Sequence, residues 1–168
     1  MHVPALNQIL ERFAPEDVLE RVGWLLSEPW PSLPYGEPEN YEAHQAAITL
    51  AREGAAREVL DKVPIQKILD YAESMQYAGV LGHALGKAVW DEKEEAAVLD
   101  AMLGRSSNNS GLITSYARGR IESTHPGWVI GQIERMKANG SCLPEACALL
   151  YLGLPEGAET SPVKVLRH

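Results

Sequence analysis

The sequence has few of the features that build β-sheets, membrane spans or polyanion-binding surfaces. The one strand-like alternation that stands out, Val163-Lys164-Val165, is too short to predict a strand. No apolar run approaches the ~20 residues that a membrane-spanning helix needs. Arg105, Arg118 and Arg120 form the nearest thing to a basic cluster, and we interpret them as solvated charges. With a formal net charge of −8, we expect neither a nucleic-acid nor a membrane partner.

Cysteine and catalytic motifs are equally scarce. Cys142 and Cys147, the only two cysteines, lie on different sides of one expected helix, so we expect reduced, buried thiols in a cytoplasmic protein. The N-terminus lacks the basic and apolar segments of a secretory signal. No two of the five histidines have a metal-ligand spacing. Without a Gly-x-Ser-x-Gly, Walker or Gly-x-Gly-x-x-Gly motif in strand–turn–helix context, we expect no catalytic residue, metal or cofactor.

What the sequence does contain is a succession of roughly eight or nine short amphipathic helices, separated by proline and glycine. Apolar residues recur at helical spacing, and alanine and leucine, which are abundant, favour helix. Gly54 marks an expected bend or junction within the longest helical stretch. The expected helices cover residues 4–13, 15–26, 39–63, 64–75, 78–90, 92–103, 112–121, 127–138 and 144–152.

The helices at 64–75 and 78–90 show the organisation best, because each carries one apolar face and only a brief break separates them. Helix starts near residues 64, 92 and 126 imply units of roughly 30–35 residues, as in helical-hairpin repeats. We therefore predict an all-α fold of antiparallel helical hairpins, stacked as a short right-handed α-α superhelix of the HEAT or TPR kind. Residues 1–153 form this one domain, and residues 154–168 form a polar, flexible tail.

Three glycines, Gly79, Gly82 and Gly86, lie near one face of the helix at 78–90. Each costs about 1 kcal/mol in a helix relative to alanine, so a gain elsewhere must offset them. Close packing of a neighbouring helix is the interpretation we favour, and a ligand approaching the backbone is the alternative. The acidic run 91–95 opens the next helix, where Asp91 and Glu94 predict a capping box; this explains the run better than a metal site does.

The best candidate for an interaction surface is the proline-rich segment 28–38, which has four prolines in eleven residues. Its Pro31-Ser-Leu-Pro34 fits Pro-x-x-Pro, a motif that docks into aromatic grooves. The alternative is that its apolar residues pin a long loop onto the helices. Aromatic residues at two helix edges extend the candidate surface. Its residues are Trp30, Leu33, Tyr35, Trp90 and Trp128.

One stretch resembles a known kind of protein. Arg21-Val-Gly-Trp24-Leu25-Leu26, a proline-rich link ending in Leu33-Pro34, and Arg52-Glu-Gly54-Ala55 together resemble the helical-repeat regions of large bacterial proteins that carry a STAND-type NTPase module. The resemblance covers residues 15–60, and the rest of the chain resembles such regions only in its helical hairpins. The NTPase residues themselves are lacking here, so the resemblance implies a recognition or scaffold segment and not an activity.

The leading hypothesis is a non-enzymatic α-helical repeat module that recognises a protein or peptide. Neither end of the chain resembles a polar cap, so we expect a segment of a larger cytoplasmic bacterial protein. Self-association through the uncapped ends is a further expectation. The alternative is a small helical enzyme or ligand-binding domain with a site between helices near His83, Tyr116 and His125.

Overall fold

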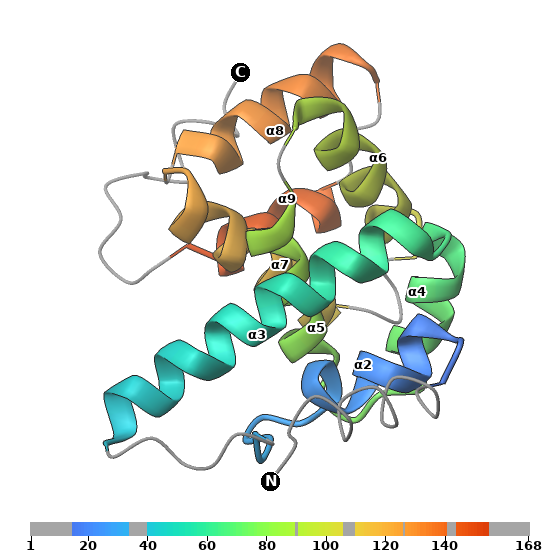
Figure 1. The fold of residues 1–168 in the computed structure, drawn as a ribbon. Helices are drawn as coiled ribbons and strands as arrows, with labels where there is room; N and C mark the ends of the chain where they lie inside the picture. The colour runs from blue at the N-terminus through green and yellow to red at the C-terminus, as the bar shows by residue number, and fades with distance from the viewer. Residues whose placement is uncertain are drawn as a thin grey trace, which may run out of the picture.

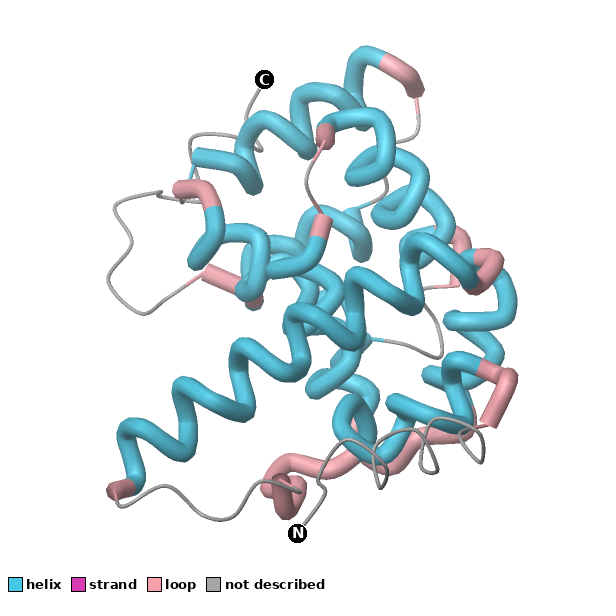
Figure 2. Tube along the Cα trace, viewed as in Figure 1, coloured by secondary structure: helices cyan, strands magenta, loops and turns pink. Residues whose placement is uncertain are grey.

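The structure, a computed structural model, describes residues 15–33, 40–89, 91–105, 110–125, 127–140 and 144–154. Within these ranges the fold is all-α, as predicted, and contains no strand (Figure 1, Figure 2). The helix expected over 4–13 and most of the expected tail lie outside the described residues. The helices are α2 (Val18–Ser27), α3 (Tyr41–Lys62), α4 (Ile65–Glu73), α5 (Ala78–Ala88), α6 (Glu92–Leu103), α7 (Ser110–Ser123), α8 (Gly127–Ala138) and α9 (Pro144–Leu152).

Side-chain caps begin several of these helices. The Asp17 carboxylate accepts the N–H of Leu19 at 2.9 Å at the start of α2. The Asp91 carboxylate accepts the N–H of Glu94 at 2.8 Å, which confirms Asp91 as the cap of α6. Gly140, with a φ of 67°, follows the end of α8 in the left-handed conformation that favours glycine. The junction predicted at Gly54 is wrong, because α3 continues through it as one helix.

Helices two apart along the chain pack against each other. The most extensive contact joins α5 to α7; α5 also packs on α3, and α7 on α9. Figure 1 shows α3 running diagonally in front of α5. The sequence predicts that the helices of residues 64–90 pack as a hairpin. In the structure, α4 and α5 make only a small contact, and α4 also packs on α6. The main packing partner of α5 is therefore α7, and not α4 or α6, its neighbours in sequence.

The contact between α5 and α7 is made by backbone against backbone. A Cβ atom added to Gly82 would lie 2.2 Å from the carbonyl oxygen of Leu112, and one added to Gly86 would lie 2.3 Å from that of Tyr116. From the other helix, a Cβ on Gly119 would lie 2.4 Å from a carbonyl oxygen of α5. No side chain fits these positions, so helix packing explains the glycines, as the sequence predicts.

The apolar core surrounds this contact. It includes Leu81 and Leu85 of α5 and Leu112 and Ile113 of α7, all completely buried, and it extends through every described helix. Each helix therefore buries one face in a common core, which agrees with the amphipathic pattern of the sequence.

Replacing Gly86 by alanine tests the backbone contact. We expect Gly86→Ala to lower the free energy of unfolding by about 3 kcal/mol, because the methyl group would force α5 and α7 apart. The matched control is Gly131→Ala, since Gly131 is an exposed glycine of α8 with nothing within 4 Å of an added Cβ. It should raise stability by about 1 kcal/mol. Urea denaturation measures the free energy of unfolding of both variants. Equal changes in the two would contradict the close packing of α5 on α7.

Candidate functional site

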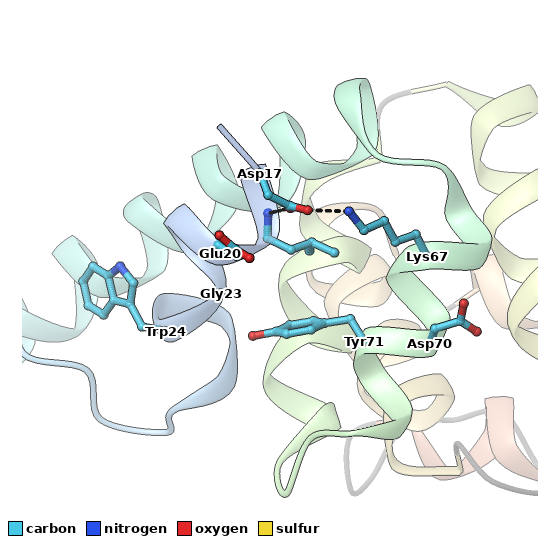
Figure 3. A pocket seen from close by; sticks show the side chains of 8 residues that line it. Asp17, Glu20, Gly23, Trp24, Lys67, Asp70 and Tyr71 are labelled. Atoms are coloured by element: carbon cyan, nitrogen blue, oxygen red, sulfur yellow. Dashed lines mark hydrogen bonds and ion pairs between the residues drawn. The ribbon is translucent and has the colours of Figure 1, made fainter. Parts of the chain in front are cut away.

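An open groove of about 490 Å³ lies between α2 and α4 (Figure 3). Trp24 and Gly23 belong to its α2 wall, and Tyr71 reaches across from α4. The Trp24 side chain is 40% exposed, although α2 buries Leu25 and Leu26 beside it. A large aromatic ring is thus kept at the mouth of the groove while the rest of its helix turns toward the core.

The spacing of residues on the two helices builds the walls. Glu20 and Trp24 are four residues apart on α2, and Lys67 and Tyr71 are four apart on α4, so each pair occupies one helix face. Gly23 allows the two walls to approach. A Cβ added there would lie 2.4 Å from the Tyr71 hydroxyl oxygen, so the tyrosine tip rests directly against the backbone of α2.

Charged residues around the groove are mostly paired. Lys67 donates to the Asp17 carboxylate across the groove, and this bond, with the N–H of Leu19, holds the pKa of Asp17 below its usual range. Asp70 accepts a hydrogen bond from Arg105 at 2.5 Å. Glu20 is exposed, and its carboxylate has no hydrogen-bond or ion-pair partner in the described part of the chain. One carboxylate at the groove therefore remains available to a ligand.

The proline-rich segment follows α2, and some of its described residues are exposed while others are partly buried. Trp30 is 62% exposed and packs on Tyr41, with ring centroids 6.1 Å apart. Leu33 is half-buried against the core. Arg52 of α3 donates to the carbonyl oxygens of Leu25, at 3.0 Å, and of the segment that follows α2. The described part of the segment is thus pinned to α3, and Trp30 remains exposed on it.

Of the other predicted surface residues, Tyr35 and Trp90 lie outside the described residues. Trp128 does not belong to an exposed surface, because its side chain is 7% exposed. It lies in the first turn of α8 with its indole directed into the core, where the ring packs edge-on against Tyr116 at 6.2 Å. From the sequence, we expect Trp128 at a helix edge. The apolar residues that follow it at helical spacing are the signal that indicates its burial.

A buried polar cluster lies where α6, α7 and α8 meet. The Glu95 carboxylate accepts hydrogen bonds from Arg120 at 2.5 Å, from the indole N–H of Trp128 at 2.6 Å and from Gln132 at 3.2 Å. Arg120 also donates to the carbonyl oxygen of Val89 at 3.0 Å, just beyond the end of α5. The interpretation of Arg120 as a solvated charge is therefore wrong, since Arg120 and Glu95 are both buried.

This cluster is fully engaged in holding helices together. Its carboxylate oxygens are occupied by protein donors, and the Arg120 guanidinium completes the carbonyl end of α5. Neither Glu95 nor Arg120 lines any described groove. The arrangement fits a structural role, in which a buried ion pair fixes the relative position of three helices.

The three residues of the predicted alternative site have different surroundings. Tyr116 is fully buried in the core. The His83 ring lies at the surface, with Nε2 3.0 Å from a carboxylate oxygen of Glu122. His125 is exposed before α8. None of the three lines a described groove, and no described hydrogen bond joins two of them. The structure therefore gives this alternative no shared catalytic geometry.

Within the described ranges, no group of three or more His, Cys, Asp or Glu side chains is arranged to hold a metal ion. None of the helices in that part of the chain has the length and apolarity that a membrane crossing requires. No protein-family model matches this sequence, and comparison with curated proteins and with solved structures gives no match.

Removing Glu95 tests the structural role of the buried cluster. We expect Glu95→Ala to lower the free energy of unfolding by about 3–5 kcal/mol, because Arg120 would remain buried without its counter-charge. Glu134→Ala, at an exposed position of α8, should change it by less than about 0.5 kcal/mol. Replacing both Glu95 and Arg120 by methionine should restore part of the loss. Denaturant titration measures the free energy of unfolding of all three variants. If Glu95→Ala changes it as little as Glu134→Ala does, the structural role of the cluster is contradicted.

The Tyr116 hydroxyl provides a pH test. It is buried without a hydrogen-bond partner among the described residues, and burial raises the pKa of Tyr116 above the ordinary 10.0. As pH rises above about 10, the unfolded chain therefore loses this proton before the folded one does, and stability falls. Tyr116→Phe should be about 1 kcal/mol more stable at pH 7, since no unpartnered hydroxyl is buried. Its advantage should grow between pH 9 and 11; an advantage that stays constant would show that Tyr116 ionises freely.

Proposed function

We propose that this chain is a non-enzymatic α-helical repeat module that binds a protein or peptide, as a segment of a larger cytoplasmic bacterial protein. The stacking of α3, α5, α7 and α9, each two helices apart in sequence, supports an architecture of the α-α superhelix kind. In such an architecture the helices supply rigid surfaces, and recognition depends on the side chains that they expose.

The observation that carries this proposal is the groove between α2 and α4, with Trp24 exposed at its mouth. Tryptophan is enriched among the residues that dominate binding energy at protein interfaces. Trp30 and Tyr41 add an exposed aromatic pair in the chain region that follows α2. The stretch that resembles repeat regions of STAND-type proteins includes α2, and it favours the same recognition role.

Selection from a display library of random 12-residue peptides tests the proposal without knowledge of the natural partner. We expect the full chain to enrich one family of peptides whose binding is lost in Trp24→Ala, because that change removes the exposed ring. Leu152→Ala is the matched control, since Leu152 is an exposed apolar residue of α9 that does not line the groove. Circular dichroism checks that both variants remain folded.

Two results would overturn the proposed function for this groove. One is that no peptide family is enriched over repeated selections. The other is that the enriched peptides bind Trp24→Ala and the unaltered chain equally well. Retained binding by Leu152→Ala together with loss in Trp24→Ala supports it.

A further inference from the structure

We propose that the α2–α4 groove selects a basic peptide segment and places a lysine or arginine side chain against the Trp24 ring, beside the Glu20 carboxylate. This inference rests on the proposed function and names the chemistry of the partner. Three observations support it: the charge balance of the groove, the position of the exposed ring, and the open shape of the site.

The charge balance of the groove is negative. Three carboxylates, those of Asp17, Glu20 and Asp70, line it with a single ammonium group, that of Lys67. Lys67 is already bound to Asp17, and Asp70 is bound to Arg105 of the loop after α6. Among the described residues, the Glu20 carboxylate therefore has no compensating cation. The formal net charge of the chain, −8, adds a long-range attraction for cations.

The exposed ring lies on the same helix face as that free carboxylate. Trp24 follows Glu20 by one helical turn, and Figure 3 shows both on the α2 wall while Tyr71 reaches toward this wall from α4. A cation is attracted to the electron-rich face of an aromatic ring, and tryptophan is the best aromatic residue for this contact. Ring and carboxylate together suit a cationic side chain with an apolar stem.

The shape of the groove favours a chain segment over an enclosed small molecule. It is open to solvent along its length and has a volume of about 490 Å³, room for a few side chains. An acidic segment would place like charges against Glu20, with no free cation in the described lining to compensate them. Among peptide segments, the groove therefore fits a basic one.

Fluorescence anisotropy with two labelled 12-residue peptides tests this inference. The peptides share their apolar residues, and one carries four arginines where the other carries four glutamates. We expect the full chain to bind the basic peptide at least about tenfold more tightly than the acidic one at 50 mM salt. The preference should narrow at 300 mM salt, because part of it is screened charge attraction.

Variants of the α2 wall separate the specific site from general charge attraction. Glu20→Gln should weaken binding of the basic peptide about fivefold. Glu16→Gln removes the same charge from an exposed position that does not line the groove, and it should have no more than a small effect. Trp24→Phe should retain part of the affinity, whereas Trp24→Leu, which keeps an apolar side chain without a ring, should lose it.

Each contrary outcome has a distinct meaning. Tight, Trp24-dependent binding of both peptides, or of the acidic one, would overturn the basic preference and leave the proposed function intact. If Glu20→Gln and Glu16→Gln weaken binding of the basic peptide equally, the groove is not the site that selects its charge. A dimer that depends on Trp24, detected by sedimentation without peptide, would show that the groove binds a second copy of the chain and not a basic segment. Failure of every peptide, including library peptides, would overturn the proposed function itself.

Discussion

The close approach of α5 and α7 is the interaction on which the other helices depend. Carbonyl oxygens of each helix occupy the space where the other has a glycine, so no side chain separates the two backbones. Gly153, just beyond the end of α9, also lies close to α7, since a Cβ added there would lie 2.7 Å from the Cβ of Ala117 and 2.9 Å from the carbonyl oxygen of Thr114. Together with the packing of α3 on α5, these contacts define the centre of the molecule.

Arginine side chains attach the outer helices to this centre. Arg120 of α7 reaches the end of α5 and binds Glu95 of α6. Arg57 of α3 donates to the carbonyl oxygen of Ala88 at 3.0 Å and binds the Glu94 carboxylate of α6. Arg52 holds the end of α2. The groove lies at the edge of this framework, where exposed aromatic and acidic side chains do not compete with core packing.

Local features of the chain were predictable from the sequence, and tertiary partners were not. Proline, glycine and capping residues predicted most helix ends, and three glycines on one face predicted a close helix contact. The identity of that neighbour, α7, depends on packing between segments some thirty residues apart, which periodicity does not encode. Arg120 resembled a solvated charge for the same reason. The groove was missed because its walls belong to two helices that are separated by α3.

Native-state hydrogen exchange tests the central place of the α5–α7 contact most directly. If this contact holds the fold together, amides of both helices should exchange only through global unfolding, with protection that matches the free energy of unfolding from denaturation. Amides of α2, at the edge, should exchange through smaller openings. Exchange of α5 and α7 amides at lower protection than those of α2 would contradict the account.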